Sequence, residues 1–226
     1  MVDKPAHLLV HPSKPGNPPT LLDGLVQLLA FELATGGQIS IMNRLDRETS
    51  GIVLAAKHRK AATELGKAKV AGEFTKTYEA IIHGWPEADE FAINEPVLRK
   101  GTVEPSEIHV RQMVHPDGKP CSTTVSVLAR FAKRDAKYSH VRCGLITGRM
   151  HQIRVHLEWA GHPLLGDKIY GHCGQAYLDF IAEGWTPKLA KQLILNRHAL
   201  HACGLKWRDF HWKSPLPHDF GEILKK

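Results

Sequence analysis

The stretch Asn43-Arg44-Leu45-Asp46-Arg47-Glu48-Thr49-Ser50-Gly51 places two arginines, a carboxylate between them and two hydroxyl groups within nine residues. The runs on either side, residues 39–42 and 52–56, are apolar and predict short buried strands. The charged stretch is therefore expected to be a connection held between two rigid elements, which is where functional side chains concentrate.

Asp46 is the first candidate for chemistry in this stretch. Its neighbours Arg44 and Arg47 are cations, and nearby cations favour the ionised form of a carboxylate. The alternative is a polar turn, in which Asp46, Thr49 and Ser50 bond their own backbone around Gly51. Taken one at a time, these residues fit both interpretations.

Composition and charge restrict the class of protein. A chain of 226 residues with 42% apolar residues is long enough for one sizeable core, in one or at most two domains. Lys and Arg number 30 against 23 Asp and Glu, which gives a formal net charge of +7. This excess favours a polyanionic partner, although moderately basic proteins are also common without one.

Four cysteines occur, and no two of them form a CxxC pair, so we expect reduced thiols and no zinc or redox site. The N-terminus lacks a long apolar run, and no run of about eighteen apolar residues occurs in the sequence. We therefore expect no secretion and no membrane span, and place the chain in the cytoplasm.

Periodicity predicts an α+β fold with an antiparallel-rich mixed sheet flanked by helices. We expect one domain over residues 1–226, with residues 172–197 as a peripheral helical insertion. The proline-rich residues 11–19 predict a loop, and Thr20 with Asp23 predicts a helix start. The other expected helices cover residues 58–72, 148–161 and two short stretches within 176–195; the expected strands cover residues 7–10, 75–83, 107–114, 123–131, 137–146 and 198–207, and residues 214–220 are expected to form a loop.

A second polar stretch runs from Thr147 to Leu157, where Thr147 or Gly148 is expected to cap a helix. Helical spacing places Arg154 on its polar side, together with His151 and Glu158. His151 and His156 are five residues apart, which does not put two imidazoles on one face, so we reject a metal site here.

Arg44-Leu45-Asp46-Arg47-Glu48-Thr49-Ser50-Gly51 resembles the RLDxxTSG motif of the RluA family of pseudouridine synthases. The resemblance extends over most of the chain through residues 4–12, 76–78, 148–156, 161–163, 166–167 and 200–202. One departure is Asn43, where the family usually has histidine. We expect this change to affect local geometry rather than activity.

The resemblance implies isomerisation of uridine to pseudouridine in structured RNA, without cofactor or metal. Asp46 matches the catalytic aspartate, which acts either as a nucleophile at C1′ of the ribose or as a base at C2′. Arg154 matches the arginine that pairs with this aspartate, and Tyr78 the tyrosine that stacks on the target base and assists removal of the C5 proton. Arg44 matches a residue that holds the target nucleotide out of the stack, and we add Arg149 and His151 as substrate-binding residues.

Alternatives exist for each residue and for the whole chain. Tyr78 alone fits a core aromatic, Arg154 a solvated helix charge, and His151 a local hydrogen-bonding residue. A catalytically silent RNA-binding module or RNA chaperone is the second hypothesis for the chain, and a hydrolase that releases uracil is the third. We expect a monomer without an obligatory protein partner, no separate N-terminal RNA-binding domain, and ribosomal or transfer RNA as the target.

Overall fold

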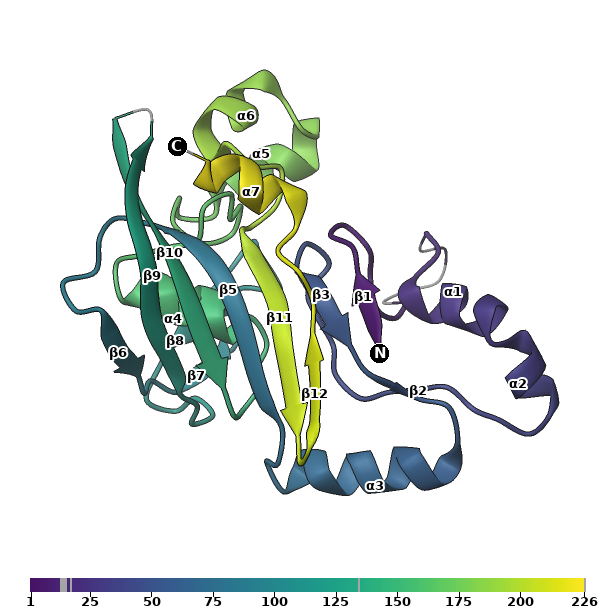
Figure 1. The fold of residues 1–226 in the computed structure, drawn as a ribbon. Helices are drawn as coiled ribbons and strands as arrows, with labels where there is room; N and C mark the ends of the chain where they lie inside the picture. Colours follow the sequence, from purple (N-terminus) through teal and green to yellow (C-terminus); the bar gives the residue numbers. More distant parts are fainter. Residues whose placement is uncertain (13–15, 17, 134, 226) are drawn as a thin grey trace. The chain divides into compact units, whose positions relative to one another are not determined.

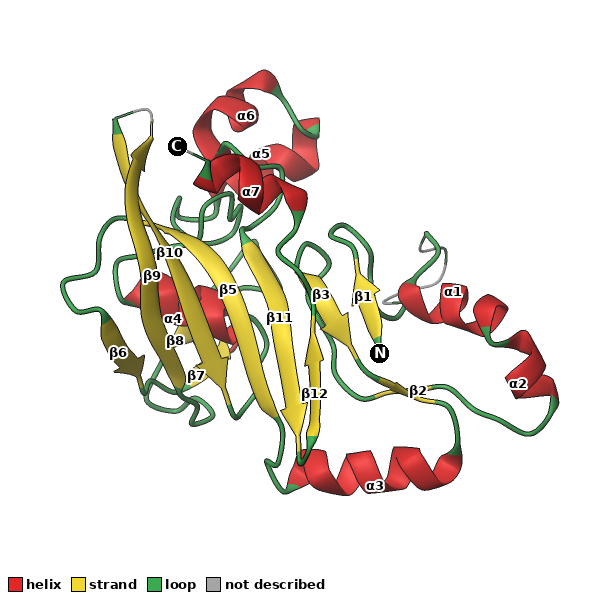
Figure 2. Ribbon diagram, in the orientation of Figure 1, coloured by secondary structure: helices red, strands yellow, loops and turns green. Residues whose placement is uncertain are grey.

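A computed structural model describes residues 1–12, 16, 18–133 and 135–225. Four residues of the predicted proline-rich loop, 13–15 and 17, lie outside the described residues. The chain packs into two compact units: unit 1 comprises Met1–Lys76 and His201–Pro215, and unit 2 comprises Thr77–Leu200 and Leu216–Lys226. Figure 1 shows the course of the chain and Figure 2 its secondary structure.

Unit 1 is built on a small mixed sheet. Strand β3 (Ser50–Val53) pairs antiparallel with β1 (Val2–Lys4) and parallel with β11 (Leu200–Trp207). Strand β12 (Phe210–Lys213) forms an antiparallel hairpin with β11, and β2 (Ser40–Ile41) pairs with β4 (Ala55–Ala56). The helices of this unit are α1 (Leu21–Leu28), α2 (Ala30–Ala34) and α3 (Arg59–Val70).

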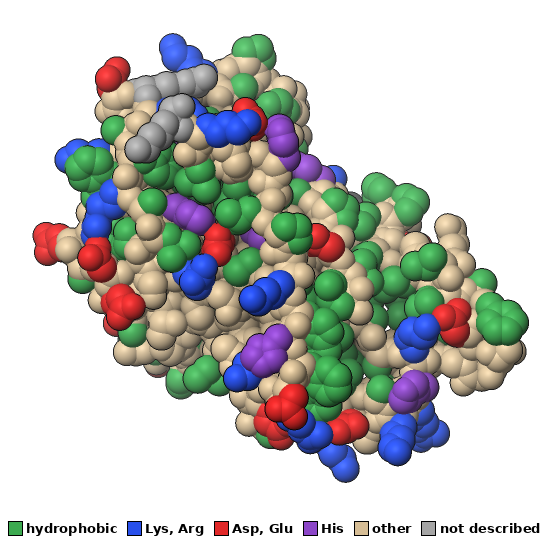
Figure 3. All heavy atoms as spheres, in the orientation of Figure 1, with side chains coloured by type: hydrophobic (Ala, Val, Ile, Leu, Met, Phe, Trp, Pro, Cys, Tyr) green, Lys and Arg blue, Asp and Glu red, His purple; other side chains and the backbone are tan. Residues whose placement is uncertain are grey.

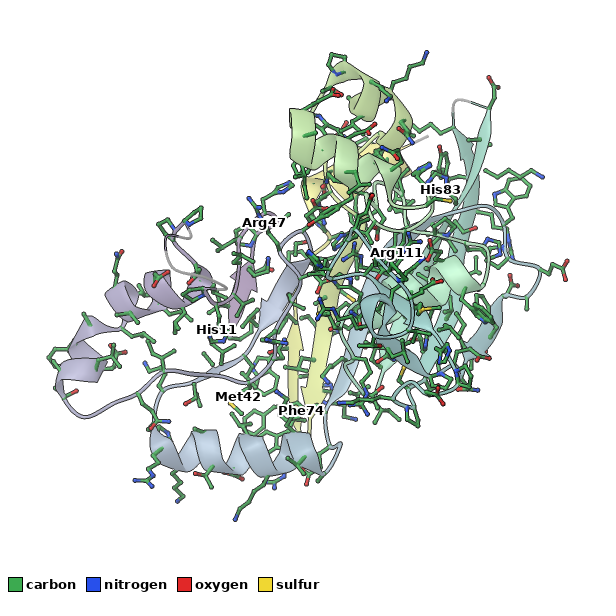
Figure 4. All side chains as sticks on the ribbon, turned by 180° about the vertical axis from the view of Figure 1, so that it is seen from behind. His11, Met42, Arg47, Phe74, His83 and Arg111 are labelled. Atoms are coloured by element: carbon green, nitrogen blue, oxygen red, sulfur yellow. The ribbon has the colours of Figure 1, made fainter. Side chains whose placement is uncertain are left out.

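The core of unit 1 lies between α3 and these strands. Leu65 and Ala68 of α3 pack with Ile52, Leu205 and Trp207. Figure 4 shows Met42 and Phe74, two further members of this core, above α3. The predicted capping box at the start of α1 is confirmed, because Asp23 N donates to Thr20 Oγ1 and Thr20 N donates to Asp23 Oδ2.

Unit 2 contains most of β5 (Thr75–His83), followed in the sheet by β10 (Ala136–Leu145), β9 (Thr123–Lys133) and β6 (Glu90–Ile93). β9 pairs antiparallel with both β10 and β6. The pairing with β10 is the one expected for strands joined by a short turn, whereas β6 reaches β9 after the intervening β7 and β8. A separate ribbon joins β7 (Val97–Arg99) to β8 (Gln112–Val114), with a 3₁₀ turn at Lys100–Thr102 between them. The helices are α4 (Gln152–Trp159), α5 (Gln175–Glu183), α6 (Pro187–Leu193) and α7 (His218–Leu224).

The predicted fold class is confirmed, since the strands form a mixed, mostly antiparallel sheet with helices. The two short helices predicted within residues 176–195 are also confirmed as α5 and α6: α5 ends at Glu183, just before Gly184, and α6 begins at Pro187.

Several predicted elements differ from the structure. The strand expected at His7–Val10 lies instead at Val2–Lys4, because the chain turns at His7, which has a left-handed backbone (φ 65°). The strand expected at Glu107–Val114 is limited to Gln112–Val114, and the loop expected to reach Phe220 ends where α7 begins at His218. Strands β6, β7 and β12 were not predicted, since runs of three or four residues carry too little periodicity.

Candidate active-site residues

The charged motif forms the connection that leads from β2 into β3. Leu45 is buried, Asp46 is half-buried, and Arg44 and Arg47 are exposed. Thr49 N donates to the carbonyl of Asp46 at 3.2 Å, so the backbone turns between these two residues, while Ser50 Oγ lies against His201. The turn and a role for the Asp46 carboxyl are compatible, because this hydrogen bond uses only the backbone of Asp46.

The Lys4 side chain binds the backbone of the motif at Arg47. Its ammonium group is buried and donates to the carbonyls of Pro5 and Leu8 at 2.8 Å and of Arg47 at 3.2 Å. A buried ammonium requires such acceptors, so Lys4 ties β1 to the segment that carries Asp46. The sequence identified Lys4 only as part of a motif and not as a structural anchor.

Gly51 ends the motif where β3 meets β11. Its φ is +113°, and a β-carbon there would overlap the carbonyl of Ala202. Beside it, Ser50 Oγ lies 2.9 Å from His201 Nδ1, and both side chains are buried. Only glycine allows the two strands to approach this closely, which explains the residue that closes the motif.

Asn43 uses both ends of its amide. Its Nδ2 donates to the carbonyl of Ile52 at 2.9 Å, and its Oδ1 accepts from Leu54 N at 2.8 Å. The side chain therefore fixes the start of the motif to the strand that follows it. This is the local supporting role that we expected for the position.

Arg154 is buried, and the alternative of a solvated helix charge is wrong. Its Nε donates to Asp167 Oδ2 at 2.7 Å and its Nη2 to Asp167 Oδ1 at 2.8 Å. Burial alone would raise the pKa of Asp167, but the charge and hydrogen bonds of Arg154 outweigh it and hold that pKa below its usual value. The guanidinium is thus fixed in orientation by a bidentate ion pair.

The helix that carries Arg154 begins later than predicted. α4 starts at Gln152, and His151 precedes it with a left-handed backbone (φ 56°). The Gln152 side chain accepts from Arg149 N and from Thr147 Oγ1, each at 3.0 Å, and this turn replaces the first turn of the predicted helix. Arg149 and Met150 are exposed on it, so Met150 does not join an apolar stripe.

Tyr170 connects His151 to Arg154. The Arg154 guanidinium lies 4.9 Å from the centre of the Tyr170 ring, and the Tyr170 hydroxyl lies 2.9 Å from His151 Nδ1. The same hydroxyl accepts from Gln112 N at 3.0 Å. The sequence gave no signal for this role of Tyr170, because the contact depends on how the loop after α4 folds back.

The predicted site residues fall in two groups. Asp46 and Arg44 lie on one loop of unit 1, whereas Arg149, His151 and Arg154 lie on one segment of unit 2. Tyr78, on β5, is buried in unit 2. The pairing of Asp46 with Arg154 stays a prediction.

Within the described part of the chain, no group of three His, Cys, Asp or Glu side chains could hold a metal ion. In the same residues, no helix is long and apolar enough to cross a membrane.

Comparison with known proteins decides the family. The family model of RNA pseudouridylate synthases matches residues 1–159, which include Asp46, Tyr78 and Arg154. The chain belongs to this family. The resemblance that its motifs indicated is therefore confirmed.

Relatives in this family match along the whole length of the chain. An uncharacterised RNA pseudouridine synthase of Chloroflexus aurantiacus is 34% identical over 99% of this chain and 65% of its own length. The ribosomal large subunit pseudouridine synthase D of Escherichia coli is 32% identical over all of this chain and 66% of its own length. The chain thus spans about two thirds of the length of these relatives.

A solved structure supports the fold. The human RNA pseudouridylate synthase domain containing 4 superposes with a TM-score of 0.75, covering 98% of this chain and 87% of its own, at 22% sequence identity. The pseudouridylate synthase fold therefore accounts for nearly the whole chain.

Proposed function

We propose that this chain isomerises specific uridines in structured RNA to pseudouridine. The observation that carries the proposal is the family match over residues 1–159, which includes the three residues expected to do the chemistry. The geometry within each unit supports it: a rigidly anchored turn presents Asp46, and a buried ion pair orients Arg154. We further propose that residues 1–226 act as one catalytic domain, with residues 172–197 as a peripheral insertion that contributes to target choice.

In the proposed reaction the N1–C1′ bond of the target uridine breaks, the uracil turns, and a C5–C1′ bond forms. C5 loses its proton and N1 gains one, so no atom is added or lost. Asp46 acts at the ribose, as a nucleophile on C1′ or as a base at C2′. Arg154 keeps this carboxylate ionised, and Tyr78 stacks on the base and assists removal of the C5 proton.

The target must leave its stack before it can react. Enzymes that modify a base inside a helix extrude it and offset the cost with stacking and polar contacts. We assign Arg44, Arg149 and His151 to this task. Arg44 and Arg149 are exposed, as contact with RNA requires, whereas His151 also bonds Tyr170 and so links substrate contact to the Arg154 cluster.

We propose RNA as the partner, without cofactor, membrane or obligatory protein partner, and a monomer in the cytoplasm. The names of the curated relatives favour large-subunit ribosomal RNA as the target. Transfer RNA is the second candidate, because one enzyme can read a loop shape that both share.

Mapping of the modification tests this function. The protein is incubated with total RNA from a strain that lacks it, pseudouridine is mapped at nucleotide resolution, and free uracil is measured in parallel. New pseudouridine at defined sites, with no uracil released, is the expected result. Released uracil would instead identify a hydrolase, and binding without either product would identify a silent RNA-binding module.

A further inference from the structure

The hairpin of β11 and β12 carries a sequence that the proposed chemistry does not use. Its tip reads Lys206-Trp207-Arg208-Asp209-Phe210-His211-Trp212-Lys213, in which three aromatic rings alternate with three cations and one histidine. Stacking platforms flanked by cations are typical of surfaces that bind single-stranded nucleic acid.

The aromatic rings of the hairpin form one continuous stack. The ring centres of Phe210 lie 5.8 Å from those of Trp207 and 5.6 Å from those of Trp212, with interplanar angles of 13° and 7°. Phe74 also stacks with Trp207, with ring centres 6.0 Å apart. Trp207 is buried in the core, Trp212 packs partly against it, and Phe210 is 55% exposed. Phe210 therefore lies between the two tryptophans but is the most exposed of the three rings, so part of its ring is open to a further partner.

The β11–β12 hairpin is joined to α3 and to Glu73 by side-chain hydrogen bonds. Trp207 Nε1 donates to Glu73 Oε2 at 3.0 Å, and Arg208 Nη1 donates to Glu64 Oε1 of α3 at 2.9 Å. The Arg208 guanidinium also covers the Trp207 ring at 4.5 Å. A base that packs on Phe210 would meet a ring already held between Trp207 and Trp212, which reduces the entropy lost on binding.

Arg208 pairs with Glu64, whereas the other two cations of the hairpin, Lys206 and Lys213, have no acidic partner among the described residues. Lys206 and Lys213 are exposed, and no described acidic side chain lies within ion-pair distance of either. Register places Lys206 opposite His211 on one face of the hairpin and Trp207 opposite Phe210 on the other. Lys213 is two residues from His211 and so shares the face of Lys206, opposite the aromatic rings. Because β12 pairs with β11 alone among the described strands, its outer edge is open between these two faces.

The charge of unit 1 points to the same partner. This unit holds thirteen Lys and Arg against eight Asp and Glu, so it carries most of the net positive charge of the chain. Figure 3 shows hydrophobic side chains reaching the surface along β12, with cationic side chains beside them and around α3. An apolar protein surface would use the aromatic rings but would leave these cations uncompensated.

We propose that the Lys206–Lys213 hairpin is an RNA-binding surface that takes an unpaired segment of the substrate RNA outside the target uridine. A base packs on the exposed part of the Phe210 ring on one face of the hairpin, the RNA backbone crosses the open edge of β12, and neighbouring phosphates lie at Lys206 and Lys213 on the other face. This inference rests on the proposed function for the identity of the RNA, but the binding itself does not require the isomerisation.

Photo-crosslinking tests the surface directly. Asp46→Asn protein is irradiated with a 4-thiouridine-containing loop RNA of the kind found modified, and crosslinked peptides are identified by mass spectrometry. Crosslinks within residues 206–213 are expected, and their absence alongside crosslinks elsewhere would overturn the proposal. Because Asp46→Asn cannot turn over in the proposed mechanism, the crosslink reports binding alone.

Affinity measurements give the matched comparison. Phe210→Ala is expected to weaken RNA binding about 5-fold to 100-fold, the range measured for loss of one stacked base, and Phe210→Tyr should retain parental affinity. Phe31→Ala is the control, since Phe31 is an exposed aromatic of the same unit that makes none of these ring contacts. Equal affinity of Phe210→Ala and the parent would overturn the stacking contact.

Salt dependence tests the phosphate contacts. Lys206→Gln and Lys213→Gln should each reduce the slope of log K against log salt by about 0.7, whereas Lys225→Gln, which removes a lysine that pairs with Glu222, should not. An unchanged slope in both hairpin variants would contradict the assignment. If these variants lose RNA affinity but the parent protein forms no pseudouridine, the RNA-binding surface is supported and the proposed isomerase function is wrong. If the parent forms pseudouridine and the variants bind RNA normally, the isomerase function is supported and the RNA-binding surface is wrong.

Discussion

Arg154 and Asp167 form a bidentate ion pair whose side chains are 5% and 0% exposed. Asp167 Oδ1 additionally accepts from the backbone N–H groups of Ile169 and Tyr170 at 3.0 and 3.1 Å. The Asp167 carboxylate thus binds both the Arg154 guanidinium and the backbone of the loop after α4. Arg154 therefore has a structural role beside the catalytic one that we propose.

This double role changes what substitution of Arg154 should do. As the proposed partner of Asp46, Arg154 is required for activity, so Arg154→Ala should form no pseudouridine. The structure predicts in addition a loss of about 3–5 kcal/mol of unfolding free energy, because Asp167 would be left as a buried, unpaired charge. Urea unfolding measures this loss.

A double variant separates the two roles. Arg154→Met with Asp167→Leu removes both buried charges, and should recover most of the stability lost in Arg154→Ala while remaining inactive. Recovery of activity along with stability would show that Arg154 only supports the fold.

The free energy of unfolding at acid pH should also depend on the Arg154–Asp167 ion pair. The pKa of Asp167 is lowered in the folded protein relative to its ordinary value of 3.8, so the ion pair contributes fully above that value and its contribution is lost as pH falls further. Unfolding free energies of the parent and Asp167→Asn, measured from pH 7 to pH 3, should therefore converge at the acid end. Part of the acid loss persists in the variant, since Arg197 also lowers the pKa of Asp219. Parallel curves would contradict the coupling.

A separate loss of stability is expected at a higher pH than the loss caused by Asp167. Burial lowers the pKa of His156 from 6.5, against the opposing hydrogen bond to the Glu95 carbonyl. The neutral form is favoured in the folded state, so stability should fall as pH drops below about 6.5 in parent and Asp167→Asn alike.

Asn43 offers a test of local support. Asn43→Ala leaves the carbonyl of Ile52 and the N–H of Leu54 without their side-chain partner, and should cost about 1–3 kcal/mol of stability together with activity. Asn43→His, the residue usual in the family, has one donor and one acceptor and should retain more of both. If Asn43→Ala equals the parent in both measurements, the amide does not position the motif.

The basic helix α3 should contribute to RNA affinity. Lys60, Lys67 and Lys69 are exposed, and no described acidic side chain pairs with them. Binding should weaken steeply as salt rises, because each phosphate contact releases counterions, and the triple change to Gln should flatten this dependence. A nearly flat dependence in the parent would show that these lysines form only a solvated face.

The sequence was most informative where many residues repeat one pattern. α3 and β5 were located closely, because each carries a long amphipathic run or alternation, and the motif around Asp46 was correctly placed between strands. The late start of α4 could not be seen, since it depends on the Gln152 side chain replacing a helical turn.

The partner of Arg154 shows a second limit. Asp167 was noted as part of a motif, but a contact between residues thirteen apart, across a loop, follows from tertiary packing and not from local periodicity. The same applies to Lys4, whose role depends on three carbonyls brought together by the fold.

In the proposed function, Asp46 carries out the chemistry on uridine. Single-turnover formation of pseudouridine should be compared between the parent and Asp46→Asn on one RNA, with binding of that RNA measured alongside. We predict that Asp46→Asn folds and binds RNA like the parent but forms pseudouridine at least about 10⁴-fold more slowly. Pseudouridine formation by Asp46→Asn at the parental rate would contradict the account.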